Sequence, residues 1–346
     1  MSELADVLIA WQRKHGRHHL PWQDSNDPYA VWLSEIMLQQ TQVNTVIPYY
    51  QRFIQRFPDL ESLAQAPLDD VLALWSGLGY YTRARNLHRA VHLIMTEYQG
   101  IFPQTREKIQ QLPGIGRSTA AAIAVFAFGQ RDAILDGNVK RVFARYFGIA
   151  GYPGETETLA KLWQLAEQSL PGNDNPTDIK TYTQGLMDLG ALLCIRRNPS
   201  CECCPLQHAC VAYREKRVAL LPASKPRKRL PEKQTVFMIY RAKQKLLLEK
   251  RPSQGIWGGL WCFPENVVDK NRLAAEGSTH IVELPQLMHT FTHFRLWIYP
   301  QLVEMNAEMD SIGKMTVWIR PEEALDLAIP TPVRKLILQH FLNDLN

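Results

Sequence analysis

The sequence predicts a multidomain protein, with an all-helical N-terminal part followed by a smaller α+β domain. Three observations support this prediction. Apolar residues follow a helical period over most of the first half of the chain, and four cysteines then fall within one short loop. A basic, proline-containing linker follows, and the segments beyond it have the composition of strands. At 346 residues the chain is long enough for two or three domains.

The expected elements follow from apolar spacing and helix or strand propensity. Helices are predicted at residues 28–40, 61–75, 82–98, 105–111, 118–128, 139–147 and 156–169. Strands are predicted at Thr235–Tyr240, Lys245–Leu248, Phe294–Tyr299 and Thr316–Ile319, the first two around a turn, and closing helices at Pro321–Leu327 and Pro332–Leu345. The predicted domain limits are 1–212 for the helical domain, 213–233 for the linker and 234–346 for the α+β domain.

Charge and hydropathy limit the class of protein. The formal net charge of +5 permits nucleic-acid binding without requiring it. No apolar run approaches the ~20 residues that a membrane helix needs, so we expect no membrane partner. The segment from Met1 to Trp11 lacks the basic start and the long apolar core of a signal peptide. We therefore expect a cytoplasmic protein, in which stable disulfides are disfavoured.

The four cysteines of the loop are Cys194, Cys201, Cys204 and Cys210, in the spacing C-x6-C-x2-C-x5-C, and they can hold one metal centre. Zinc is the alternative, because four cysteines satisfy a structural tetrahedral site. Zinc sites usually pair two short C-x-x-C knuckles across a longer gap, whereas here only Cys201 and Cys204 form such a pair. The compact, asymmetric run favours an iron–sulfur cubane, in which each iron takes one thiolate. Cys203 is expected to be a bystander.

A glycine-containing turn, Leu112-Pro-Gly-Ile-Gly116, lies between two predicted helices. Thr105 can cap the first helix, and the second opens at Arg117 and ends at Gly129. Glycines let the backbone approach a ligand closely, and the amides at the start of the second helix form an anion site. A dinucleotide-binding turn is excluded because a helix precedes the glycines. A plain interhelical turn is the alternative.

Two carboxylates are candidates for catalysis. Asp136 precedes an amphipathic helix, of which Asn138 is the expected N-cap. Glu35 shares a helix face with the apolar residues Trp32 and Ile36, so desolvation should raise its pKa. A carboxylic acid with a raised pKa is what protonation of a poor leaving group requires. A turn-forming Asp136 and an exposed Glu35 at the edge of the apolar stripe are the alternatives.

The hairpin, Asp136 and the cysteine loop together resemble the helix-hairpin-helix DNA glycosylase superfamily, which includes endonuclease III. The closer resemblance is to the MutY adenine DNA glycosylases, and it covers essentially the whole chain. The residues that carry it are Pro21-Trp-Gln23, Trp32-Leu-Ser-Glu-Ile-Met-Leu-Gln-Gln-Thr41, Gly77-Leu-Gly-Tyr-Tyr81, Leu135-Asp-Gly-Asn-Val139 and the cysteine loop. Gln254–Pro264 resembles the Nudix-like domain of the same family.

The resemblance implies an all-α helix-hairpin-helix glycosylase domain with a [4Fe–4S] cluster loop, and a smaller α+β Nudix-like domain that reads 8-oxoguanine. It implies a monofunctional DNA glycosylase that hydrolyses the N-glycosidic bond of adenine mispaired with 8-oxoguanine or guanine in duplex DNA, leaving an abasic site in base excision repair. Bifunctional relatives carry a nucleophilic lysine in the second hairpin helix, where this chain has Ser118. A bifunctional glycosylase/lyase like endonuclease III is therefore the alternative, and a non-enzymatic DNA-binding protein with a structural zinc is another.

The resemblance also implies roles for individual residues. Glu35 protonates adenine, Asp136 stabilises the charge on the sugar, and Asn138 orients nearby groups. Trp22, Gln23 and Gln184 line the adenine pocket, Gln40 and Tyr80 wedge into the base stack, and the amides of Gly114 and Gly116 hold a DNA phosphate. Ser118 stands where many relatives have Tyr, and Phe291-Thr292-His293 stands where many have Phe-Ser-His. Arg196 and Arg197 fit phosphate contacts beside the cluster.

Two further expectations concern the C-terminal domain and the setting. No Nudix catalytic box follows Pro264, so hydrolysis of nucleotide pyrophosphates is not expected. We expect a monomer that works on the bacterial nucleoid in the cytoplasm. The sequence indicates no particular repair partner.

Overall fold

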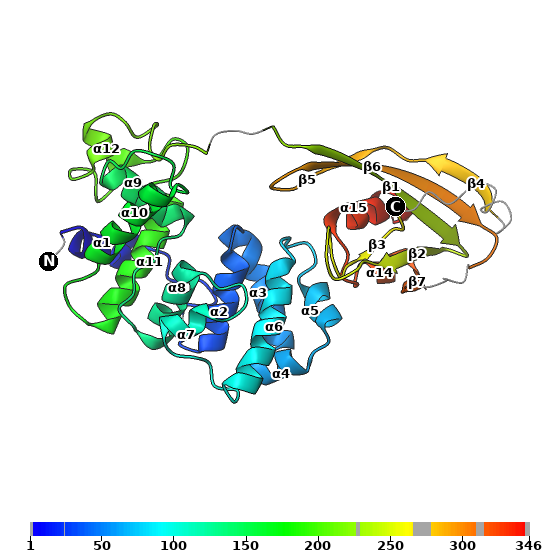
Figure 1. Cartoon of the computed structure of the whole chain (residues 1–346), viewed down its shortest axis with the longest axis horizontal. Coiled ribbons are helices and arrows are strands. Elements are labelled where there is room, and N and C mark those ends of the chain that lie inside the picture. Colours follow the sequence, from blue (N-terminus) through cyan, green and yellow to red (C-terminus); the bar gives the residue numbers. More distant parts are fainter. Residues whose placement is uncertain (1–2, 24, 226–228, 266–277, 309–314, 343–346) are drawn as a thin grey trace. The chain divides into compact units, whose positions relative to one another are not determined.

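The chain forms two compact units in the computed structural model (Figure 1). The structure describes all residues except 1–2, 24, 226–228, 266–277, 309–314 and 343–346. The first unit comprises Met1–Gln65 and Asn86–Arg227, and the second comprises Ala66–Arg85 and Lys228–Asn346. Pro226, Arg227 and Lys228 of the predicted linker, and the end of the predicted C-terminal helix, lie outside the described residues. The predicted domain limits stay a prediction.

The described part of the first unit is helical. Its elements are α1 (Glu3–His15), α2 (Pro28–Leu38), α3 (Val43–Arg56), α4 (Leu60–Gln65), most of α6 (Thr82–Glu97), α7 (Arg106–Gln110), α8 (Arg117–Phe128), α9 (Gly137–Tyr146), α10 (Thr156–Gln168), α11 (Pro176–Leu192), the 3₁₀ turn η1 (Cys201–Cys203) and α12 (Val211–Arg214). Helix α11 packs against α1, α8 and α9, and α2 packs against α3 and α8. Leu8, Phe143 and Leu186 belong to the buried core between α1, α9 and α11.

Six of the predicted helices are found close to their predicted limits, as α2 and α6 to α10. The prediction of one helix over 61–75 is wrong. Two helices, α4 and α5 (Leu68–Leu74), take its place, because Pro67 has no N–H to donate and becomes the N-cap of α5. Among the described residues, four α-helices were not predicted: α1, α3, α11 and the short α12. Pro48 lies inside α3, and Gly185 and Gly190 lower the helix propensity of α11.

The second unit is built on a mixed sheet. Its strands are β1 (Glu232–Ala242), β2 (Lys245–Lys250), β3 (Trp261–Cys262), β4 (Ser278–Glu283), β5 (Leu287–Thr290), β6 (Arg295–Met305) and β7 (Thr316–Ile319), and its helices are α5, α14 (Pro321–Ala324) and α15 (Thr331–Phe341). The order is β3-β2-β1-β6-β4, with β5 paired to β6 and β7 paired to β2. Strands β1 and β6 run parallel, from Glu232 opposite Arg295 to Arg241 opposite Glu304. All four predicted strands are present, while β3, β4 and β5 were not predicted.

Residues 66–85 belong to the second unit through polar and packing contacts. The Ser76 hydroxyl donates to the Ile329 carbonyl at 2.9 Å, and the Tyr81 hydroxyl donates to the same oxygen at 3.2 Å. The segment that carries Tyr80 is thereby held to the chain just before α15.

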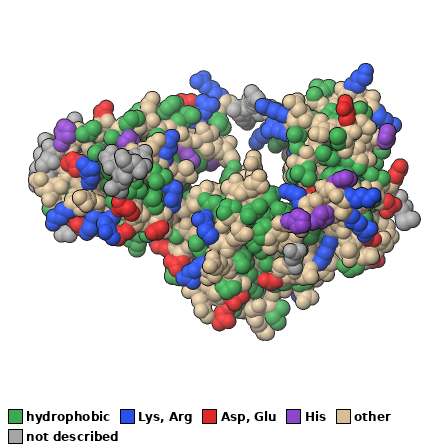
Figure 2. Space-filling model, turned by 180° about the vertical axis from the view of Figure 1, so that it is seen from behind, with side chains coloured by type: hydrophobic (Ala, Val, Ile, Leu, Met, Phe, Trp, Pro, Cys, Tyr) green, Lys and Arg blue, Asp and Glu red, His purple; other side chains and the backbone are tan. Residues whose placement is uncertain are grey.

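Surface charge alone does not mark a functional face. Basic and acidic side chains are interspersed over the face seen in Figure 2. No helix within the described residues is both long enough and apolar enough to cross a membrane.

Candidate active site

A cavity of about 400 Å³ opens in the first unit between α2, α11 and the segment that follows α1. Trp22, Gln23, Glu35 and Gln184 all line it, so the structure brings together four of the residues that the sequence indicated. The volume falls within the ~300–1,000 Å³ of typical small-molecule sites.

The segment before α2 is fixed by the side chain of Gln23. The Gln23 carbonyl oxygen accepts from the Leu20 amide at 3.0 Å, and the Gln23 amide donates to the Arg17 carbonyl at 2.8 Å. Trp22 is only 8% exposed, and its ring meets Tyr50 edge to face at a centroid distance of 5.3 Å. These contacts give the cavity a rigid wall on this side.

A buried ion pair lies behind the cavity and was not predicted. Asp188 is fully buried and accepts from the Arg17 backbone N–H at 2.8 Å and from Arg17 Nε at 2.7 Å. Gln184 Nε2 donates to the same carboxylate at 2.8 Å. This bond uses an N–H of Gln184 and fixes its amide, so that the carbonyl oxygen remains as the acceptor for a ligand. An acidic residue one helical turn after Gln184 was the available signal, but α11 itself was not predicted.

Glu35 lies in α2 between neighbours that are buried as predicted: Trp32 is 0% exposed and Ile36 is 3% exposed. The helix begins at Pro28, with Asp27 as the N-cap that accepts from the Tyr29 amide at 3.0 Å. Protein atoms surround the carboxyl group, although part of the side chain is accessible from the cavity. Burial, and secondly the charge of Asp136, raise the pKa of Glu35 to about 8. The predicted direction is confirmed, and the carboxyl group is protonated at neutral pH.

Asp136 is the N-cap of α9, and its carboxylate accepts from the Val139 amide at 2.8 Å. The prediction that Asn138 caps this helix is therefore wrong, because the Asp136 carboxylate reaches the amide three residues on and the helix begins at Gly137. Burial raises the pKa of Asp136, while the backbone amides of Val139 and Asn138 oppose that rise. The positive end of α9 also favours a carboxylate at this position.

Asn138 is held by an arginine that also reaches the cysteine loop. Arg141 donates to Asn138 Oδ1 at 2.9 Å, to the Gly190 carbonyl at 2.7 Å and to the Cys194 carbonyl at 2.7 Å. A Cβ atom at Gly190 would lie 2.7 Å from the Asn138 Cβ, so only glycine permits this close approach of α11 to α9. The loop and the catalytic candidates are thus joined through one side chain.

Ser118 lies in the second hairpin helix, close in space to the chain before Asp136. Its hydroxyl oxygen accepts from the Leu135 amide at 2.9 Å. This bond ties the start of α8 to the residue next to Asp136. Ser118 therefore has a structural partner beside the site, and its hydroxyl supplies no amine for Schiff-base chemistry.

The hairpin has the backbone that its glycines predicted. Gly114 has φ 81°, and a side chain there would clash with Asn86 at 2.7 Å. Gly116 is the N-cap of α8 and faces open space, so the first amides of that helix have no side-chain cap. Such amides form an anion site. Gly129 ends α8 in a left-handed conformation with φ 67°, as predicted.

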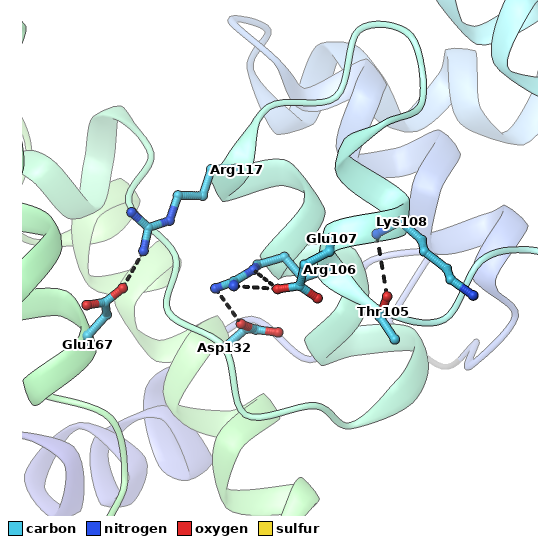
Figure 3. A network of polar contacts seen from close by, with 7 residues as sticks. All are labelled: Thr105, Arg106, Glu107, Lys108, Arg117, Asp132 and Glu167. Carbon is cyan, nitrogen blue, oxygen red and sulfur yellow. Dashed lines mark hydrogen bonds and ion pairs between the residues drawn. The ribbon is translucent and has the colours of Figure 1, made fainter.

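Ion pairs connect the two hairpin helices, α7 and α8, to neighbouring parts of the chain (Figure 3). Thr105 caps α7 by accepting from the Lys108 amide at 3.4 Å, as predicted. Arg106 pairs with Asp132 at 3.0 Å, and Arg117 pairs with Glu167 of α10. The hairpin is thereby tied to the chain that leads to Asp136 and to the helix that follows α9.

Gln40 and Tyr80, the expected wedge residues, both have strained backbones within their own units. Gln40 follows α2 with φ 57°, and Tyr80 follows Gly79 with φ 49°. Gln40 is exposed, and Tyr80 is 45% exposed. Left-handed backbone is uncommon for non-glycine residues, and such strain concentrates at functional sites. The prediction that α2 extends to residue 40 is wrong, because the chain leaves the helix after Leu38.

The four predicted cluster cysteines line one cavity beside Arg145, which is 4% exposed. Arg145 Nη1 lies 3.4 Å from Cys194 Sγ and donates to the Ile195 carbonyl at 2.7 Å. Within the described ranges, no three Cys, His, Asp or Glu side chains come close enough together to hold a single metal ion. Burial and the neighbouring thiols raise the pKa of Cys204 to about 11. A group that binds one thiolate at each corner would be held by these four side chains around the cavity.

Phe291-Thr292-His293, the expected recognition loop, lies at the turn between β5 and β6 in the second unit. The Phe291 amide donates to the Phe294 carbonyl at 2.9 Å, which closes a tight turn. Thr292 and His293 are exposed at its tip, and Thr292 Oγ1 lies 3.4 Å from His293 Nδ1. The loop is thus shaped to present two polar side chains.

Comparison with known proteins accounts for both parts of the chain. Residues 33–168 match the model described as HhH-GPD superfamily base excision DNA repair protein, and residues 235–339 match the NUDIX domain. The adenine DNA glycosylase of Buchnera aphidicola subsp. Schizaphis graminum is 39% identical over 96% of this chain and 97% of its own. The adenine DNA glycosylase of Homo sapiens is 33% identical over 95% of this chain and 72% of its own. This chain belongs to the adenine DNA glycosylase family.

The adenine DNA glycosylase fold is shared with relatives that carry other names. A solved structure of a thermostable thymine-DNA glycosylase is 30% identical, with a TM-score of 0.55, over 61% of this chain and 95% of that one. The predicted fold class, a helical hairpin domain followed by a Nudix domain, is confirmed.

Glu35→Gln should change how the stability of this adenine DNA glycosylase depends on pH. The native pKa of about 8 lies above the ordinary value of 4.5, so the native state holds an extra proton between these values and loses stability as pH rises through them. Gln has no proton to lose. The variant should therefore gain a few kcal/mol of unfolding free energy, relative to the parent, between about pH 5 and about pH 8. Urea unfolding at both pH values measures the difference.

The exposed Glu97, on the surface of α6, provides the matched control. Glu97→Gln should follow the parent at both pH values. Equal pH dependence of Glu35→Gln and the parent would show that Glu35 is not held protonated by the fold.

Proposed function

We propose that this chain hydrolyses the N-glycosidic bond of adenine mispaired with 8-oxoguanine or guanine in duplex DNA, and so starts base excision repair. The observation that carries the proposal is the raised pKa of Glu35, which is caused by burial and, secondly, by the neighbouring Asp136. Two carboxyl groups whose environments set different protonation states can act as acid and as electrostatic stabiliser. Family membership supports adenine as the base.

The target adenine has to leave the helix, because its sugar bond is unreachable inside a duplex. The cavity beside Glu35 receives the flipped base against Trp22. The Gln184 carbonyl oxygen, left as acceptor by the bond to Asp188, suits the exocyclic amine of adenine. Gln23 uses both ends of its amide on Leu20 and Arg17, so its role is to shape the wall.

The chemistry proceeds from the two carboxyl groups. Glu35 gives its proton to N7 of adenine, which makes the base a better leaving group. The bond from C1′ to N9 breaks, its electron pair stays with the base, and positive charge develops on the sugar. The Asp136 carboxylate stabilises that charge, and water then adds to C1′ and loses a proton. Asn138, held by Arg141, orients the nearby groups, and Ser118 steadies the chain before Asp136.

The remaining roles concern DNA. The amides after Gly114 and Gly116 suit a phosphate, and the strained, exposed Gln40 and Tyr80 suit insertion into the base stack. The loop Phe291-Thr292-His293 reads the 8-oxoguanine opposite adenine, with the Thr292 hydroxyl in place of the serine of many relatives. The chain acts on duplex DNA as a monomer, on the nucleoid of a bacterial cytoplasm.

Cys194, Cys201, Cys204 and Cys210 would hold a [4Fe–4S] cluster. The cluster supplies structural order when bound and takes no part in the hydrolysis. Arg145 is buried against the loop, and Arg196 and Arg197 within it suit phosphate contacts. The cluster would hold this basic loop in place beside α9.

Glu35→Gln should abolish adenine release while leaving duplex binding largely intact. Loss of the acid should lower the single-turnover rate at least ~10²-fold on adenine opposite 8-oxoguanine, because general acids contribute ~10²–10⁴-fold. The parent's rate should fall as pH rises above about 8, where Glu35 loses its proton. The assay uses duplexes with adenine opposite 8-oxoguanine, guanine, thymine and cytosine, and Glu97→Gln is the control. Near-normal cleavage by Glu35→Gln would reject the mechanism.

The same assay separates the bifunctional alternative. Borohydride should trap no covalent complex at a rate that matches base release, because Ser118 has no amine. Trapping as efficient as base release would favour a glycosylase/lyase instead.

Cys204→Ser should remove the iron from the purified protein, whereas Cys203→Ser should not. Cys204 lines the shared cavity and the exposed Cys203 does not, so the two adjacent residues make a matched pair. Metal analysis and the broad visible absorbance are the measurements, with about four irons expected per chain. Zinc in place of iron, or equal loss in both variants, would contradict the cluster.

A further inference from the structure

A tryptophan with strained backbone lies in the segment that precedes β3. Trp257 has φ 54° and yet is only 8% exposed. A bulky residue adopts this conformation only where its surroundings fix it. Here the Leu260 amide donates to the Trp257 carbonyl at 3.0 Å, and a side chain at Gly258 would meet the Ser253 carbonyl at 2.4 Å. The backbone of Trp257 is therefore held in the strained form. The contacts of the Trp257 side chain indicate the reason.

The Trp257 ring contacts the recognition loop directly. Its centroid lies 5.5 Å from that of Phe291 and 5.7 Å from that of His289. It also lies 6.1 Å from Phe237, a fully buried residue of β1. Trp257 therefore connects the core of the domain to the loop.

Phe291 is enclosed by aromatic rings. Phe294 stacks on it at 4.4 Å with an interplanar angle of 20°, and His289 meets it edge to face at 4.6 Å. Burial lowers the pKa of His289, which favours a neutral ring in this cluster. With Trp257 included, three rings limit where the Phe291 side chain can lie.

The turn transmits this constraint to the exposed tip. The bond from the Phe291 amide to the Phe294 carbonyl closes the turn, so only Thr292 and His293 lie between two anchored residues. Their side chains are exposed, while Phe291 is half-buried. Where Thr292 and His293 point therefore depends on where Phe291 is held.

We propose that Trp257 is a positioning residue for recognition of the base opposite adenine, acting through Phe291 on Thr292 and His293. The inference rests on the proposed function, in which this loop reads 8-oxoguanine. Trp257 itself makes no contact with DNA in this account. Removing its ring should therefore reduce selectivity for the opposite base and leave the chemical step unchanged.

The test compares Trp257→Leu with two reference variants. Trp257→Phe keeps an aromatic ring. Trp261→Leu removes the tryptophan at the start of β3, whose ring centroid lies 5.7 Å from Lys250 Nζ. The Kd is measured for a non-cleavable duplex that carries 2′-fluoro-2′-deoxyadenosine opposite 8-oxoguanine or guanine. The ratio of the Kd for the guanine duplex to the Kd for the 8-oxoguanine duplex measures selectivity. This ratio should fall about tenfold in Trp257→Leu and stay within about threefold of the parent value in the two reference variants. The single-turnover rate on saturating adenine:8-oxoguanine duplex should stay at the parent value.

Each other outcome overturns the inference. A parent ratio in Trp257→Leu excludes a positioning role, and so does an equal loss of affinity for both duplexes. If circular dichroism shows that Trp257→Leu does not fold, His289→Leu removes another ring of the cluster and should lower the ratio in the same way. A parent ratio in that variant rejects the inference. A parent protein without any preference rejects the recognition function itself, and this inference with it.

Discussion

The site depends on one electrostatic constraint, which is that Glu35 keeps its proton while Asp136 carries charge. Burial is the larger cause of the raised pKa of Glu35, and the charge of Asp136 adds to it. A rise from 4.5 to about 8 corresponds to several kcal/mol of preference for the neutral acid, at ~1.4 kcal/mol per unit. The fold has to supply this preference. It does so by placing Glu35 between buried side chains of α2 and by placing Asp136 at the positive end of α9.

The neighbouring contacts keep these two groups in place. Ser118 holds the residue before Asp136, and Arg141 joins Asn138 to the start of the cysteine loop. Behind the cavity, the buried Asp188 fixes both Arg17 and Gln184. The cysteine loop is thus physically continuous with the site, although its cysteines are not among the groups that line the base cavity.

The sequence predicted the elements whose signals are local. The hairpin, its caps at Thr105 and Gly129, and the raised pKa of Glu35 follow from residue type and helical period. The cap of α9 was misplaced by two residues, because Asn and Asp both cap helices and only the backbone decides between them. The roles of the pocket and loop residues came from family resemblance, and they stay predictions.

Other features depend on tertiary contacts that no local pattern reveals. The buried charge of Asp188 is compensated by Arg17, which lies 171 residues away in the sequence. The strained backbone of Trp257 has no marker in its own sequence, since glycine or asparagine would be expected at such a position. Strands β4 and β5 gain their stability from pairing with β6, and their own residues are mostly exposed or half-buried, which weakens the apolar alternation.

The most direct measurement is the titration of the Glu35 carboxyl group itself. Carbon-13 NMR of glutamate-labelled protein, with the Glu35→Gln spectrum used to assign the signal, follows its protonation as pH is raised. This carboxyl group is expected to remain protonated at neutral pH and to titrate near pH 8. A midpoint near the ordinary value of 4.5 would contradict this expectation, because Glu35 would then have no proton to give to the leaving adenine.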